Sequence, residues 1–238
     1  MSPAVRCMIA MMGELKTSHE LLNKLAHSVR QDGIIAGFYN PILGGFAGGE
    51  EGLAVLITAG IIALQMVYMS VTHSTCPTHP SLFNDTAPQI LRAVSAATAA
   101  ISRNSPIMTT IMTSPVGGPG KDTVLYKCIA MATTATVCGA SQVFGTRSAV
   151  GVVPNHCTGL EARFNGEVGY TAAGMTRVEA EEIVQKAVAA YEPVMATKPV
   201  GQTFQEVYDP VTIKPKEEWL EVYDRVKEEA IGWGLPLN

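Results

Sequence analysis

Charged side chains are scarce in this sequence of 238 residues. Asp, Glu, Lys and Arg make up only 16% of it, whereas a typical soluble domain is about a quarter charged. No charged residue occurs between Glu51 and Asp85, and apolar residues reach 47% of the chain. We therefore expect much of the surface to be covered by a partner subunit or by further chain.

The sequence also lacks a basic field. Lys plus Arg number 17 against 21 for Asp plus Glu, a net charge of −4. Clusters of basic residues and aromatic stacking platforms are absent, which argues against a nucleic-acid partner. The five cysteines are odd in number and widely scattered, a pattern typical of reduced thiols in a cytoplasmic protein.

Signals for export or membrane insertion are weak. The N-terminus has an early Arg6 but too short an apolar run for a signal peptide. The charge-free stretch from Leu53 onward is interrupted by Gln65, Pro77 and Pro80, and other charge-poor stretches consist largely of Ala, Thr, Ser and Gly. Such segments insert poorly into bilayers, so we expect no membrane span.

Apolar runs and helical patterns alternate along residues 1–175. Leucines at helical spacing predict a first helix over about 2–30. Buried strands are then predicted at 33–43, 67–73, 106–112 and 142–146, with Asp85 or Thr86 capping the helix that contains Pro88. Helices are predicted at about 50–66, 86–102, 122–139 and 159–173.

The strands recur about every 34 to 39 residues, which indicates successive βα units with a parallel sheet. Such units build either a (β/α)8 barrel or a doubly wound sheet, and no G-x-G-x-x-G follows the first strand. Four units are half of a barrel and leave open strand edges. Residues 176–238 differ: amphipathic helices at about 176–191 and 215–231, joined by a loop over 198–214, predict a helical extension of the same single domain.

Candidate functional residues follow the carboxyl ends of the predicted strands, where barrel chemistry is located. Glu50 and Glu51 suit the positive end of a helix dipole, and we favour that interpretation over catalysis. The loop from Ser114 to Gly120 resembles an anion cradle but lacks the ending of a P-loop, so a plain turn is favoured. The full set is Glu50, Glu51, His73, Cys76, His79, Asn84, Asp85, Lys121, Asp122, Arg147, Asn155, His156 and Cys157.

One pattern in this set raises the hypothesis of a metal. His73, Cys76 and His79 form H-x2-C-x2-H, and His156 or Cys157 would complete four zinc ligands. The spacing is not that of a standard zinc finger. Unrelated polar loop residues are the simpler interpretation, and a metal-dependent barrel enzyme is kept as an alternative.

Several stretches together resemble the C-terminal half of the corrinoid-dependent monomethylamine methyltransferases, in order and over nearly the whole chain. The most specific lie in the segment 158–168 and in the tail; the glycine motif alone would be weak. They are Thr158-Gly-Leu-Glu161-Ala-Arg163, Gly166-Glu-Val168, Thr203-Phe-Gln-Glu206, Tyr208-Asp209, Pro215, Glu217-Glu218, Val222-Tyr-Asp224, Gly44 to Gly49, Glu14-Leu-Lys16 and Pro77-Thr-His79.

The resemblance implies a (β/α)8 barrel that forms homo-oligomers and moves a methyl group from a methylamine to Co(I) of a partner corrinoid protein, as in methanogenesis. It implies that the chain itself binds no cofactor, since the cobalamin belongs to the partner. The family's reactive pyrrolysine lies in the half that precedes this sequence. Glu51 and His79 are the residues that we assign to the substrate cavity.

Departures from the family pattern are concentrated at polar positions. The family has an acidic residue near Phe38, a glutamine near Met112 and a glutamate near Met8, and this sequence has none of them. Whether the chain is an enzyme therefore stays open. The alternative is a non-catalytic oligomeric scaffold that binds a corrinoid protein. Three origins are also open: translation after an amber codon, a short diverged relative, or a longer protein that lost its first half.

Overall fold

The computed structural model describes residues 6–12 and 15–237 as an α/β fold with parallel strands and crossover helices. In chain order the main elements are β1 (Arg6–Met12), α1 (His19–Arg30), β2 (Ile34–Asn40), α2 (Glu50–Met66), β3 (Thr72–Thr75), α3 (Pro88–Asn104), β4 (Thr109–Thr113), α4 (Asp122–Val137), β5 (Gln142–Thr146), α5 (Gly159–Thr171), α6 (Arg177–Met195) and α8 (Glu217–Gly232).

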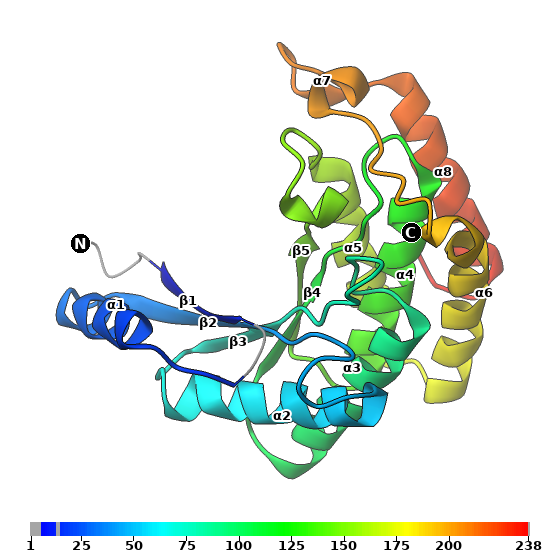
Figure 1. The fold of residues 1–238 in the computed structure, drawn as a ribbon. Helices are drawn as coiled ribbons and strands as arrows, with labels where there is room; N and C mark the ends of the chain where they lie inside the picture. The colour runs from blue at the N-terminus through cyan, green and yellow to red at the C-terminus, as the bar shows by residue number, and fades with distance from the viewer. Residues whose placement is uncertain (1–5, 13–14, 238) are drawn as a thin grey trace.

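The five strands pair in parallel in their order along the chain, β1-β2-β3-β4-β5. A doubly wound sheet reverses its strand order at a switch point, and this sheet does not, so the sequential order selects the barrel architecture. The helices lie along the outer side of the curved sheet, and among the described residues no helix covers the inner side (Figure 1). The inner side is called the concave face below.

The core lies between the sheet and the outer helices, and α4 is at its centre. Every residue of α4 from Thr123 to Ala135 is buried. The tail helices α6 and α8 both pack on α4 (Figure 1), and Trp219 and Tyr191 bring large fully buried side chains to that contact. The scarcity of charge is thus explained in part by the chain's own tail.

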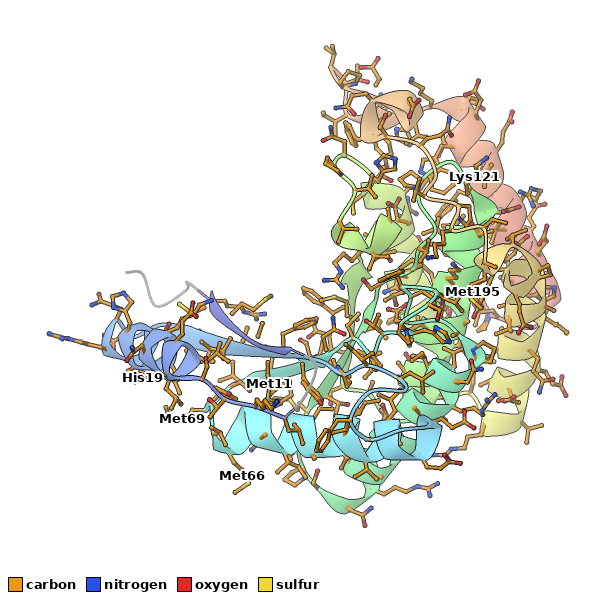
Figure 2. The ribbon with its side chains drawn as sticks, viewed as in Figure 1. Met11, His19, Met66, Met69, Lys121 and Met195 are labelled. Atoms are coloured by element: carbon orange, nitrogen blue, oxygen red, sulfur yellow. The ribbon has the colours of Figure 1, made fainter. Side chains whose placement is uncertain are left out.

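The prediction of one helix over residues 2–30 is wrong for Arg6–Met12, which forms the edge strand β1. The helix α1 begins at His19, with Ser18 accepting a hydrogen bond from the N–H of Leu21 as the cap. The parts of the prediction at 2–5 and 13–14 lie outside the described residues. The strand was missed because its Met and Ala residues have high helix propensity. Met11 of β1, labelled in Figure 2, belongs to the same buried cluster as Leu64 of α2.

Two further predictions are corrected. The apolar run 67–71 is not a strand: α2 continues to Met66, a turn with Met69 at positive φ follows, and β3 begins at Thr72. Met66 and Met69 are exposed (Figure 2), whereas Tyr68 packs in the core. The cap of α3 is Ala87 rather than Asp85 or Thr86.

The predicted loop over 198–214 contains a short helix, α7 (Phe204–Val207), and the two-residue strands β6 (Tyr208–Asp209) and β7 (Lys214–Pro215). Helix α6 extends four residues beyond the predicted end, to Met195, with Pro193 in its last turn. No helix in the described part of the chain is long and apolar enough to span a membrane.

Candidate functional site at the carboxyl ends of the strands

The concave face carries a row of side chains that crosses the whole sheet. Paired residues of adjacent parallel strands project to the same face, and the register joins Ala10, Phe38, Ser74, Thr110 and Gln142 in one row. A hollow of about 140 Å³ opens on this face. Its lining is Arg6, Met8, Ala36, Gly37, Phe38, Thr72, Ser74, Met112, Gln142 and Phe144.

Three residues of this hollow stand where the resemblance places polar side chains. Met8, Phe38 and Met112 all line it, and Phe38 packs with Cys76 and Met112 in a separate apolar cluster. Among the described residues the lining contains no Asp or Glu. The three departures from the family pattern therefore fall on one surface and make it apolar.

A polar cluster lies where β3, β4 and β5 end. It consists of Cys76, Asp85, Ser114 and Arg147, which we call the strand-end cluster. The backbone N–H of Ser114 donates to Asp85 Oδ2, and Cys76 Sγ lies 3.8 Å from the same oxygen. Arg147 Nε donates to Ser114 Oγ at 2.6 Å, and Arg147 Nη2 lies 3.6 Å from Cys76 Sγ.

Burial governs the charge state of this cluster. Asp85 is only 1% exposed, and burial raises the pKa of its carboxyl to about 7 despite the Ser114 hydrogen bond and the nearby cations. Asp85 Oδ1 has no hydrogen-bond partner among the described residues. Burial and the neighbouring Asp85 raise the pKa of the Cys76 thiol to about 12, so Cys76 is a neutral thiol at physiological pH.

Lys127 of α4 is the buried cation behind this cluster. The side chain is fully buried, Nζ has no hydrogen-bond partner among the described residues, and it lies 5.5 Å from the ring centroid of Tyr191. Burial lowers the pKa of Lys127 to about 8, and the charge of Asp85 opposes that effect. Lys127 is the only charged residue from 123 to 146, a signal in the sequence that we did not use.

Glu161 is a second buried acid with a different environment. Its Oε1 accepts hydrogen bonds from the Thr158 N–H at 2.6 Å and from Ser148 Oγ at 2.9 Å, and its Oε2 accepts one from Thr158 Oγ1. Together with Thr158 it forms the capping box of α5. Burial raises the pKa of Glu161, and these hydrogen bonds oppose the rise.

The structure does not bring Glu51 and His79 together by any contact that it records. Glu51 is exposed in the first turn of α2. His79 is half-buried, and its Nδ1 accepts hydrogen bonds from the N–H groups of Ser81 and Leu82, both at 3.3 Å, which closes its own turn. Their assignment to the substrate cavity stays a prediction. Glu50 forms a salt bridge with Arg92 at 2.8 Å, which fits a structural role.

The metal alternative is not supported by the geometry. No group of three His, Cys, Asp or Glu residues within 6–12 and 15–237 is placed to hold a metal ion. His73 Nδ1 donates to Met108 O at 2.8 Å, behind the sheet, whereas Cys76 joins Phe38 in the cluster of the concave face. Residues an odd number of positions apart on a strand project to opposite faces, so the pattern does not converge.

The remaining candidates have structural partners. Asn84 Oδ1 accepts hydrogen bonds from the N–H groups of Thr86 and Ala87 at 3.0 and 2.9 Å and so serves the start of α3. Asp122 pairs with Arg225 at 3.1 Å. His156 Nδ1 lies 2.7 Å from Pro154 O, Cys157 Sγ lies 3.5 Å from Ser148 O, and Asn155 O accepts from the Phe204 N–H at 2.6 Å. Lys121 is exposed at the start of α4 (Figure 2).

The glycine-containing loop 114–120 is packed under the tail. A side chain at Gly118 would collide with Val200 O, and the Gln202 N–H donates to Pro119 O at 2.9 Å. This close approach of two backbones explains the glycine at 118. The contact fits the favoured interpretation of the loop as a plain turn.

Sequential parallel strands, outer helices and a polar cluster at the carboxyl strand ends define one half of a (β/α)8 barrel. A sequence model of the monomethylamine methyltransferase MtmB matches residues 5–235. The chain belongs to the monomethylamine methyltransferase family and corresponds to its C-terminal half.

Relatives from Methanosarcina species show how much of the family is represented. The chain is 34% identical over 227 residues to monomethylamine methyltransferase MtmB2 of Methanosarcina acetivorans, which covers 95% of this chain and 50% of that protein. It is 35% identical over 228 residues to MtmB3 of Methanosarcina barkeri, with the same coverage. The chain thus spans about half the length of the curated relatives that it matches.

Solved structures agree with the sequence comparison. The crystal structure of the Methanosarcina barkeri monomethylamine methyltransferase superposes with a TM-score of 0.93 at 32% identity and covers 97% of this chain and 50% of that one. The hydroxylamine complex of MtmB gives the same values. This likeness confirms the half-barrel predicted from the sequence.

Proposed function

We propose that this chain forms half of a methyltransferase barrel that moves a methyl group from a methylamine to the cobalt of a partner corrinoid protein. The observation that carries the proposal is the superposition of 97% of the chain on half of an MtmB crystal structure with a TM-score of 0.93. The corrinoid, carried by the partner, supplies the methyl acceptor.

The chain's own contribution is the wall of the barrel. Met8, Phe38 and Met112 line the hollow of the concave face and give it an apolar wall. Arg147, held by Ser114 at 2.6 Å, places a cation at the edge of that wall. Glu51, in the first turn of α2, and His79, in the loop that follows β3, remain the proposed cavity residues.

An assay of methyl transfer tests the proposal. The purified chain is mixed with methylamine and a corrinoid protein reduced to Co(I), and loss of the Co(I) absorbance is followed. Transfer by the chain alone, or transfer only after a polypeptide for the other half of the barrel is added, supports the proposal. The absence of transfer under both conditions contradicts it.

The second candidate is a non-catalytic scaffold that binds a corrinoid protein. It is favoured by one observation: an apolar cluster of Phe38, Cys76 and Met112 occupies the surface where the resemblance places polar residues. The scaffold predicts that the chain co-sediments with a corrinoid protein and leaves Co(I) unmethylated in both conditions of the assay above.

A homo-oligomer is also part of the proposal. The outer face of α2 and α3 presents an apolar groove lined by Ala54, Val55, Thr58, Ala59, Ile62, Ala96, Ala97 and Ala100. Val55 is 68% exposed there. Sedimentation velocity should show that Val55→Glu lowers the oligomeric mass, whereas Val178→Glu, at an exposed valine on α6, leaves it unchanged.

The cytoplasmic location is proposed on the unpaired state of all five cysteines.

A further inference from the structure

The strand-end cluster contains a guanidinium that has no acidic partner among the described residues. Arg147 is half-buried, and no salt bridge in the described part of the chain includes it. Its Nε is held by Ser114 Oγ and its Nη2 by Cys76 Sγ, whereas Nη1 has no recorded partner. An arginine fixed in this way presents the remaining edge of its planar group in one orientation.

Asp85, the acid of the strand-end cluster, does not fully neutralise this cation. Asp85 accepts from the backbone of Ser114, and burial raises the pKa of Asp85 to about 7, so its negative charge is only partly present at neutral pH. Lys127 also acts on Asp85 and remains largely protonated below about pH 8. Two cations therefore share one weakened acid, and the cluster carries excess positive charge.

The cation lies next to Phe38, one of the residues that line the hollow of the concave face. Arg147 Cζ lies 6.0 Å from the ring centroid of Phe38, and Phe38 and Met112 line that hollow. The lining adds a second cation, Arg6, together with uncharged polar groups and apolar side chains, and within residues 6–12 and 15–237 it includes no acid. A site of this composition disfavours an ammonium group and favours an anion attached to an apolar body.

We propose that Arg147, held by Ser114 and Cys76, binds the carboxylate of a small organic acid whose apolar part lies in the hollow against Phe38 and Met112. A planar carboxylate matches the free edge of one guanidinium, which favours it over a phosphate that calls for more donors. The inference does not depend on the proposed function. A methyl donor that carries a carboxylate would satisfy both.

Calorimetric titration of the purified full chain with three probes of equal length tests this site. The probes are butyrate, butylammonium and butyramide, which differ only in charge and hydrogen bonding. We expect butyrate to bind at least about tenfold more tightly than either of the others, because a charge-assisted hydrogen bond is worth that much. This comparison needs no variant and no methyl transfer.

Variants then assign the binding to Arg147. Arg147→Gln should weaken butyrate binding at least about tenfold, and Arg147→Lys should weaken it less, because the charge remains. Arg92→Gln is the matched control: Arg92 is exposed and pairs with Glu50 on the outer helices. Circular dichroism checks that each variant is folded.

Three results would overturn the proposal: no butyrate binding at millimolar concentration, equal binding of butyrate and butyramide, or a folded Arg147→Gln that binds butyrate as the unmodified chain does. Preferential binding of butylammonium would also overturn it and would restore the expectation of a cationic amine. Methyl transfer in the assay proposed above is measured separately, so the failure of one proposal does not affect the test of the other.

Discussion

Two buried carboxyl groups in this half-barrel have opposite surroundings. Glu161 receives hydrogen bonds from the backbone and hydroxyl of Thr158 and from the hydroxyl of Ser148. In the described part of the chain, one oxygen of Asp85 has no hydrogen-bond partner, and neither has the ammonium group of the neighbouring Lys127. A buried acid with all its hydrogen bonds formed stabilises the fold. A buried acid that lacks some of its hydrogen bonds and lies beside a buried cation is typical of a functional site.

The largest effect is expected when Glu161 is removed. Glu161→Ala leaves the Thr158 N–H and two hydroxyl groups without their acceptor inside the protein, and should lower the free energy of unfolding by about 3 kcal/mol. Urea denaturation measures this value. Glu182→Ala, at an exposed position on α6, should change it by less than about 0.5 kcal/mol. Equal effects of the two variants would mean that the hydrogen bonds to Glu161 do not stabilise the fold, and its contrast with Asp85 would be lost.

Asp85, unlike Glu161, should lower the stability of the fold when it ionises, so its effect should depend on pH. The folded chain keeps the Asp85 proton up to about pH 7, whereas the unfolded chain releases it near 3.8. The folded state thus binds more protons in that window, and this group lowers the free energy of unfolding as pH rises from about 4 to 7. Asp85→Asn should abolish the decline.

Unfolding measured at several pH values gives the difference between the unmodified chain and Asp85→Asn. A difference that does not change with pH would mean that Asp85 is ionised at its ordinary pKa in the folded chain.

Lys127 should cost stability at neutral pH. The folded chain releases its proton near pH 8 and the unfolded chain near 10.5, so this group raises the free energy of unfolding as pH increases from about 8 to 10.5. Lys127→Met replaces a buried charge by an apolar chain of similar length and should raise stability by about 1–2 kcal/mol at pH 7. The gain should shrink toward pH 10. A destabilised Lys127→Met at pH 7 would show that the ammonium group has a partner that stabilises it.

The smallest effect on stability is expected for Arg147→Gln. Arg147 is half-buried and forms no salt bridge with any described residue, so its removal should change the free energy of unfolding by less than about 1 kcal/mol. Thermal unfolding of the two proteins side by side measures it. A loss as large as that of Glu161→Ala would make Arg147 a structural clamp between the strand ends.

The architecture could be predicted from the sequence where the signal is local. Helix α2 has the predicted bounds, because Gly49 ends the loop and Glu50 opens the helix. The edge strand β1 could not, because Met and Ala in a run of seven residues fit a helix as well as a strand. The strand predicted at 67–73 lies instead at Thr72–Thr75, because the side chains there give no apolar signal.

The site was harder to predict than the fold. Cys76, Asp85 and Arg147 were among the strand-end candidates, yet Ser114 and Lys127 were not recognised as their partners. The contacts join residues 29 and 71 positions apart, and one sequence carries no record of such pairing. The resemblance did locate Met8, Phe38 and Met112, which the structure places in one hollow.

A carbon-13 NMR titration of the Asp85 carboxyl group tests the contrast between the two acids most directly, with Asp85→Asn used to assign the signal. The account predicts a midpoint near pH 7, because burial outweighs the hydrogen bond from the Ser114 N–H and the nearby cations. A midpoint near the ordinary aspartate value of about 4 would contradict it.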